Sequence, residues 1–122
     1  KAERELIVVA TSASNNCLYC VVAHGAILRI RAKNPLLADQ VATNPAEADL
    51  TDRERDIVDF ALRVAHDSAN VTDDDLAAMR AKGFTDDEIW DIGAITALFA
   101  LSNRYASVVG IRPNDEFYGM AR

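Results

Sequence analysis

The feature of this sequence that most constrains its fold is a set of three predicted helix starts. At each of them a threonine stands three residues before an acid, and an apolar repeat follows. A threonine hydroxyl there accepts a backbone N–H of the first turn, and the helix dipole favours an acid in that turn. We interpret the glutamate pairs as capping boxes and the aspartate as a dipole charge; the pairs are Thr51–Glu54, Thr72–Asp75 and Thr85–Glu88.

The apolar repeats behind these starts have the period of helices. After the first start, five residues form one stripe and predict a helix with one buried face: Ile57, Phe60, Ala61, Val64 and Ala65. The second helix is predicted to run to Ala81 and to end at Gly83. The third, from Asp86 to about Val109, is apolar nearly all round, so we expect it to be central or to lie at a subunit contact. Core packing is the leading interpretation of this helix, and self-association is the second.

The first third of the chain also has a helical pattern. Residues 3–13 contain a continuous apolar run that by its length and context predicts a buried helix, although its β-branched residues leave a strand possible. Residues 17–31 carry apolar residues at helical spacing, and Asn15 or Asn16 is expected to cap this second helix. Pro35 suits the first position of a short helix over 36–42. No alternation typical of strands appears. The sequence therefore predicts an all-α, single-domain bundle of about six helices over residues 1–112, with an irregular tail over 113–122.

The charge of the chain excludes some classes of function. With 19 acidic and 13 basic residues, its formal net charge is −6, which argues against nucleic-acid binding, because that affinity depends on clustered Lys and Arg. The one basic cluster, Arg29, Arg31 and Lys33, is interpreted as cations near a helix C-terminus. We find no apolar run approaching the ~20 residues of a membrane span and no leader with a cleavage site. We therefore expect a soluble, cytoplasmic protein with no membrane partner.

Both cysteines of the chain and one of its two histidines fall within residues 17–24. Cys17, Cys20 and His24 are spaced i, i+3 and i+7, which keeps them on one face of a helix. The thiolate is the reactive form of cysteine, and a helix N-terminus and a nearby imidazole both lower the pKa of a thiol. In such a pair one sulfur attacks, and the other condenses with the oxidised product before oxidation becomes irreversible. We therefore expect redox chemistry, with His24 as a proton relay.

These residues resemble the signature of a known family. Glu5, twelve positions before Cys17, is followed by Cys-Leu-Tyr-Cys and then by His24. This order resembles the Glu…CxxCxxxH signature of the alkylhydroperoxidase D family, part of the carboxymuconolactone decarboxylase-like superfamily. The similarity is close over residues 4–31 and looser beyond, where GFTDDEIWDI and LSNRYASVVG are similar to the family's last core helix. Four chemically distinct residue types agree at fixed offsets, so the match is specific.

The resemblance implies an all-helical enzyme, built as a dimer, trimer or hexamer, that reduces organic hydroperoxides without a cofactor or metal. It implies that Cys20 attacks the peroxide and becomes a sulfenic acid, and that Cys17 resolves it as a disulfide. His24 would pass protons to and from the pair, and Glu5 would orient and charge the imidazole. A dithiol or thioredoxin-like reductant would restore the enzyme. The long apolar helix also favours a homo-oligomer.

The sequence departs from the family pattern in two places and leaves alternatives open. Tyr19 stands where well-known members carry a second histidine, and its phenol is a much weaker acid near neutral pH. The motif also begins almost at Lys1, whereas many relatives carry additional helices ahead of it. The alternatives are a non-enzymatic redox sensor or stress-response module, a disulfide oxidoreductase without direct peroxide chemistry, two buried structural cysteines, and a zinc site built from Cys17, Cys20, His24 and Glu5.

Overall fold

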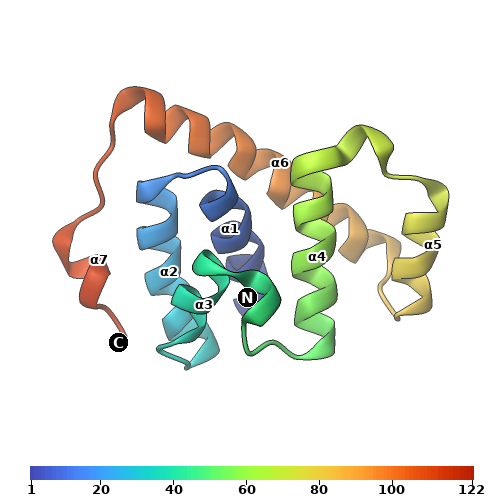
Figure 1. Ribbon diagram of the computed structural model, residues 1–122, viewed down its shortest axis with the longest axis horizontal. Coiled ribbons are helices and arrows are strands. Elements are labelled where there is room, and N and C mark those ends of the chain that lie inside the picture. The colour runs from blue at the N-terminus through green and yellow to red at the C-terminus, as the bar shows by residue number, and fades with distance from the viewer.

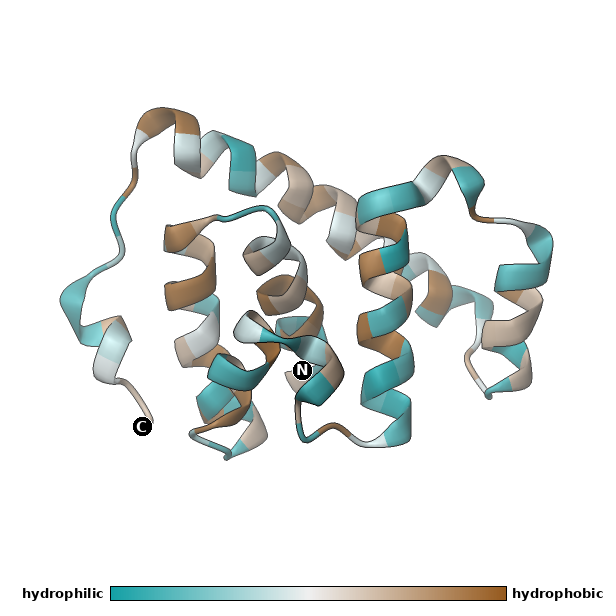
Figure 2. Cartoon of the chain, in the orientation of Figure 1, coloured by the Kyte–Doolittle hydropathy of each residue, from teal (hydrophilic) through white to brown (hydrophobic).

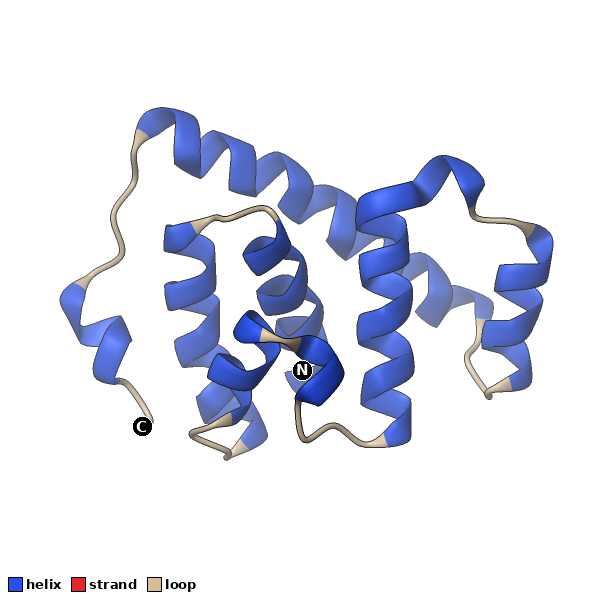
Figure 3. Cartoon of the chain, viewed as in Figure 1, coloured by secondary structure: helices blue, strands red, loops and turns tan.

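The computed structural model describes all 122 residues. It consists of helices joined by short loops and has no strand, which confirms the all-α prediction (Figure 3). The α-helices number seven rather than about six, because the C-terminal tail also forms one. Their bounds are α1 (Ala2–Ser14), α2 (Leu18–Ala32), α3 (Leu37–Thr43), α4 (Asp52–Asp67), α5 (Asp73–Ala81), α6 (Asp86–Val109) and α7 (Asp115–Gly119). Two single 3₁₀ turns, Pro45–Glu47 and Ser68–Asn70, complete the structure.

The central helix of the bundle is α1. Every residue from Leu6 to Ser12 is buried, and α1 packs against α2, α3, α4 and α6. Figure 1 shows α6 running along the length of the molecule beside α1 and α4, with α5 at one end and α7 at the other. A run of consecutive buried residues needs neighbours on all sides, and these four helices supply them. The central position, one of the two expected for the helix over 86–109, is therefore occupied by α1.

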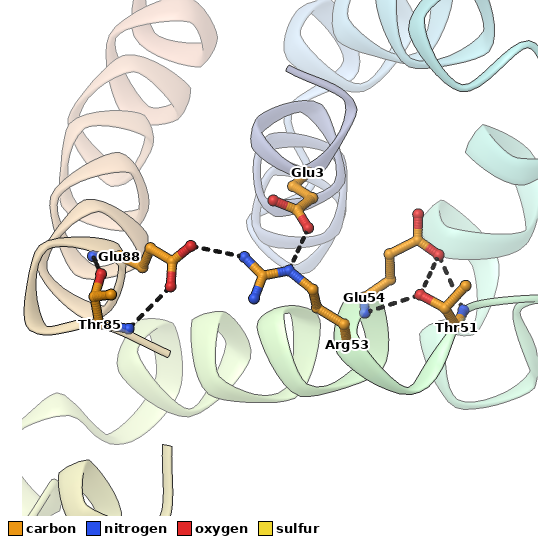
Figure 4. Close-up of polar contacts among 6 residues, drawn as sticks. All are labelled: Glu3, Thr51, Arg53, Glu54, Thr85 and Glu88. Atoms are coloured by element: carbon orange, nitrogen blue, oxygen red, sulfur yellow. Dashed lines mark hydrogen bonds and ion pairs between the residues drawn. The ribbon is translucent and has the colours of Figure 1, made fainter. Parts of the chain in front are cut away.

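The three predicted helix starts are present as predicted. Thr51 and Thr85 each accept the backbone N–H of the glutamate three residues on, and each glutamate accepts the backbone N–H of its threonine (Figure 4). Thr72 and Asp75 form the same reciprocal pair, with Thr72 N to Asp75 Oδ2 at 2.8 Å. Asp75 is thus a partner in a full capping box and not only a charge at a helix dipole. Each cap stabilises the fold by about 1 kcal/mol.

The buried face of α6 is narrower than the sequence predicts. It buries one narrow face, formed by Ile89, Ile92, Thr96, Asn103 and Ala106. Ile95 and Phe99 are half-buried, but the other large apolar side chains face solvent, so core packing was the wrong leading interpretation for these: Trp90 is 76% exposed, Tyr105 68% and Val108 86%, and Leu98 and Leu101 are also exposed. Apolar bands alternate with polar ones along α4, whereas in α6 apolar colour recurs along the whole helix (Figure 2). We call the exposed set Trp90, Leu98, Leu101, Tyr105 and Val108 the α6 apolar face.

One expectation about membranes also needs correction. By length and composition alone α6, with 24 residues, is apolar enough to cross a bilayer. The sequence hides this, because Thr96, Asn103 and Arg104 interrupt every continuous apolar run while the average stays apolar. In the structure these polar residues have specific places: Thr96 and Asn103 are buried in the bundle. The helix therefore packs along α1 and α4 as part of the bundle.

Arg53 ties three helices together at one edge of the bundle. Its guanidinium bonds Glu3 of α1 at 2.7 Å and Glu88 of α6 at 3.0 Å, as Figure 4 shows. It also lies over the ring of Phe84, 4.5 Å from the centroid. The three charged side chains are each more than 40% exposed, so each pair contributes at most about 1 kcal/mol. The main effect of this network is to fix how α1, α4 and α6 meet, and its contribution to stability is small.

The C-terminal tail is held by a buried arginine. Arg29 is only 3% exposed, and its guanidinium donates to the carbonyls of Phe117 at 2.8 Å and Met120 at 2.7 Å. The tail was expected to be irregular, but it forms α7 and packs against α2. Arg29 is therefore more than a surface cation at a helix end: it joins α2 to the last residues of the chain.

Candidate redox site

The cysteine pair begins at a tight turn between α1 and α2. Asn16 adopts a left-handed conformation, with φ 55°, that an asparagine tolerates. Neither asparagine caps α2 as expected: the N-cap is Cys17, whose Sγ accepts the backbone N–H of Cys20 at 3.3 Å. The turn itself is closed by the bond from Cys17 N to Ser12 O at 3.0 Å. The first sulfur therefore lies at the N-terminus of a helix, in the place where an oxygen usually lies.

Both cysteines are free thiols, and both are buried. Cys17 is 1% exposed and Cys20 3%, and they pack together against Ala106 of α6 and the half-buried Tyr19. Cys17 also lines a surface hollow of about 240 Å³, with Tyr19, Ile111 and Arg112 among the residues around it. Cys20 does not line this hollow. Of the two buried cysteines, Cys17 alone therefore borders this hollow.

The protonation of Cys20 differs from the sequence expectation. Burial raises the pKa of Cys20 from its ordinary value of 9.0 to about 11, and the hydrogen bond and negative charge of Cys17 add to the rise. A helix N-terminus and a nearby imidazole predicted a lowered pKa for this thiol, and the structure gives the opposite direction for the isolated chain. The helix position could be inferred from the sequence, but the depth of burial could not, and desolvation of the charged form outweighs the helix end.

One residue that acts on this thiol was not found from the sequence. An interaction with the Asn103 side chain lowers the pKa of Cys20, against the effect of burial. Asn103 is 1% exposed, donates to Ser12 Oγ at 2.8 Å and accepts from Asn15 Nδ2 at 3.0 Å. The available signal was an amide within a long apolar helix, which is costly unless it is hydrogen-bonded.

The predicted acid–imidazole pair is formed. Oε2 of Glu5, on α1, lies 2.8 Å from Nδ1 of His24, on α2. Glu3, two residues before Glu5 on α1, pairs with Arg53. The edge of His24 meets Phe99 of α6, with ring centroids 4.9 Å apart and planes at 86°. Because the carboxylate accepts a hydrogen bond from Nδ1–H, the other ring nitrogen, Nε2, carries the lone pair in the neutral imidazole.

The structure brings the four predicted residues into two pairs. The sulfurs of Cys17 and Cys20 form one pair and the side chains of Glu5 and His24 the other, and His24 follows Cys20 by one turn of α2. No group of three or more His, Cys, Asp or Glu side chains in the chain converges as ligands of a metal ion would. The zinc alternative is therefore not supported by this geometry.

Comparison with known proteins identifies the family. The model of the carboxymuconolactone decarboxylase family matches residues 1–61, and no curated protein matches the chain. The crystal structure of an alkylhydroperoxidase AhpD core, an uncharacterized peroxidase-related protein from Ralstonia eutropha JMP134, superposes with a TM-score of 0.97 at 61% identity. An uncharacterized peroxidase-related protein from Silicibacter sp. TM1040 superposes with a TM-score of 0.96 at 40% identity. Both matches cover all of this chain, which spans 64% of the length of each neighbour.

A family model that matches half of the residues and a structural match over all of this chain at 61% identity agree with the Glu…CxxCxxxH signature and with the helical architecture. The chain therefore belongs to the carboxymuconolactone decarboxylase family, in its alkylhydroperoxidase D-like branch.

Proposed function

We propose that this chain is a thiol-dependent oxidoreductase that reduces organic hydroperoxides through Cys17 and Cys20. The observation that carries the proposal is the contact of two free thiols at the N-terminus of α2, with Cys20 N 3.3 Å from Cys17 Sγ. A dithiol at a helix start is suited to reversible oxidation, because the second sulfur traps the oxidised first one. The names of the structural neighbours, alkylhydroperoxidase core and peroxidase-related protein, support the same class.

The reaction takes place in three steps. The Cys20 thiolate attacks the terminal oxygen of the hydroperoxide, the O–O bond breaks, and an alcohol leaves after it receives a proton. Cys17 then attacks the resulting sulfenic acid, forms the Cys17–Cys20 disulfide and releases water. A dithiol or thioredoxin-like reductant restores both thiols by disulfide exchange.

His24 and Glu5 supply the proton transfer that this reaction requires. With its pKa raised to about 11, the Cys20 thiol needs a base at the moment of attack. Nε2 of His24 accepts the thiol proton and returns it to the leaving alkoxide, while Glu5 holds Nδ1 and stabilises the imidazolium. The edge contact with Phe99 keeps the ring in one orientation. We assign Cys20, Cys17, His24 and Glu5 as the catalytic set on this basis.

A rapid-mixing experiment tests the proposal. Reduced protein is mixed with cumene hydroperoxide, first alone and then with excess dithiol, and the alcohol product is measured. We expect many turnovers per chain with the dithiol. Cys20→Ser is expected to abolish the reaction, and Cys17→Ser to leave a sulfenic acid that a dimedone probe traps. A single slow stoichiometric oxidation would contradict the enzyme and indicate a redox sensor. Equal loss without a trapped intermediate in both variants would contradict the assignment of the two sulfurs.

A second candidate function is disulfide exchange without peroxide chemistry. Two observations favour it: Cys17 borders the surface hollow of about 240 Å³, and Cys20 is buried with a raised pKa. A protein disulfide or dithiol that reached the pair would therefore meet Cys17 first. Reduction of a small disulfide substrate by the dithiol form, combined with no reaction with the hydroperoxide, would identify this function.

The oligomer belongs to the same proposal. The α6 apolar face is contiguous along one helix and lies uncovered in the single chain, and a patch of that kind marks an interaction surface. We propose that copies of the chain associate through it as a homo-oligomer. The cytoplasmic location stays a prediction.

A further inference from the structure

The side chain of Asn103 is held in one orientation deep inside the bundle. It is 1% exposed, and its Oδ1 accepts a hydrogen bond from Asn15 Nδ2 at 3.0 Å. Its Nδ2 donates to Ser12 Oγ at 2.8 Å. Only the oxygen of an amide accepts, so in this arrangement the bond from Asn15 occupies the oxygen and the bond to Ser12 occupies one N–H. An amide nitrogen has two hydrogens, and one N–H of Asn103 is left beyond the bond to Ser12.

The same face of α6 meets the redox pair. Ala106, one turn after Asn103, packs against both Cys17 and Cys20. Asn103 is the only side chain acting on Cys20 that lowers the pKa of this thiol, whereas burial and the side chain of Cys17 raise it. A donor lowers a pKa when it bonds the charged form more strongly than the neutral form. Asn103 thus lies one turn from the residue that packs against both cysteines, shielded from water and with one N–H to spare.

We propose that Asn103 is a positioning residue of the redox pair, whose second amide N–H donates to the sulfur of Cys20 while Ser12 and Asn15 hold the amide in place. The inference deepens the proposed function, and its catalytic consequence rests on that function. A negative charge arises on Cys20 when it loses its proton before attacking a peroxide. It arises again when a reductant thiolate attacks Cys17 Sγ, the S–S bond breaks and the electron pair passes to Cys20 Sγ. The amide stabilises the thiolate in both steps.

The test measures ionisation and uses no peroxide. In a Cys17→Ser background Cys20 is the only thiol, so the ultraviolet absorbance of its thiolate reports its pKa. We expect Asn103→Leu, which keeps the volume and removes the donor, to raise that pKa by about 1 unit, or tenfold less thiolate at a given pH. Asn103→Asp, which keeps the shape but loses both N–H groups and adds a charge, raises it by at least as much. Asn103→Asp also replaces the leucine variant if that variant does not fold.

Thr96→Val is the matched control. Thr96 is equally buried on α6, bonds only the Ile92 carbonyl of its own helix, and lies about two turns from Asn103. It is expected to lower stability without moving the titration of Cys20. Titrations of both Asn103 variants within about 0.3 units of the parent would overturn the proposal, and so would an equal shift in Thr96→Val. Absence of peroxide turnover together with the expected shift would contradict the proposed function and leave the role of Asn103 standing.

Discussion

The raised pKa of Cys20 predicts that the folded chain loses stability at alkaline pH. The substitution Cys20→Ala is expected to remove this loss. The thiol is protonated in the folded chain up to about pH 11, whereas in the unfolded chain it ionises near 9.0. Between these values the unfolded state has released a proton that the folded state retains, so the free energy of unfolding falls as the pH rises. This contribution is fully present below pH 9 and is lost by about pH 11.

The size of the loss follows from the difference between the two values. A difference of about 2 units, at about 1.4 kcal/mol per unit, corresponds to about 3 kcal/mol. A typical domain is stable by about 5–15 kcal/mol, so this loss is a large part of its stability. Half of the loss is expected by about pH 10.

Denaturant unfolding measures this loss. The wild type and Cys20→Ala are unfolded at a series of pH values from about 8 to 11 under reducing, oxygen-free conditions. Lysine, tyrosine and arginine groups titrate in both proteins and cancel in the difference, and the cost of the smaller side chain is independent of pH. We expect the difference between the two to shrink by about 2 kcal/mol over this range, which ends at the folded-state pKa and so includes most of the loss. Cys17→Ser, which removes one cause of the rise but not the burial, is expected to lose an intermediate amount. Parallel curves for wild type and Cys20→Ala would refute a buried, protonated thiol at position 20.

Three further predictions concern the relay, the α6 apolar face and the C-terminal tail. Glu5→Gln, which removes the carboxylate 2.8 Å from His24, is expected to lower dithiol-coupled peroxide turnover about 10- to 100-fold; unchanged turnover would contradict the relay. Leu101→Arg, at a position 60% exposed in the single chain, is expected to reduce the sedimenting mass to 13.3 kDa with unchanged helix content. A wild type that already sediments at 13.3 kDa would contradict the interface. Arg29→Met leaves two tail carbonyls without their donor and is expected to cost about 1–3 kcal/mol. Limited proteolysis should then cut first after residue 112, and a tail as resistant as in the wild type would contradict this anchor.

Features that depend on neighbours in sequence were predictable. The threonine caps, the end at Gly83 and the bounds of α6 depend on bonds between residues three or four apart, and the structure has them where the sequence placed them. The pairing of Glu5 with His24 was also predictable, but only from the family offset. The short α7 was missed because five residues are too few to show a helical repeat.

Features that depend on distant neighbours could not be read from the sequence. Asn103 meets Asn15 across 88 positions, and no local pattern marks that contact. The uncovered face of α6 was ranked behind core packing for a related reason: an apolar helix looks the same in sequence whether its cover is its own chain or another one. The pKa of Cys20 was predicted in the wrong direction because position on a helix is a local property, while burial depends on the packing of α1, α2 and α6.

The sulfur that begins α2 makes the start of this helix sensitive to oxidation. A thiolate accepts the N–H of Cys20 more strongly than a thiol does, and a sulfur committed to a disulfide is at best a weak acceptor. The exchange rate of that one amide hydrogen with heavy water should therefore rise when the protein is oxidised, while amides in the interior of α1 remain protected. The exchange rate of the Cys20 amide hydrogen therefore reports the redox state of the pair, and it can be measured by spectrometry without added substrate.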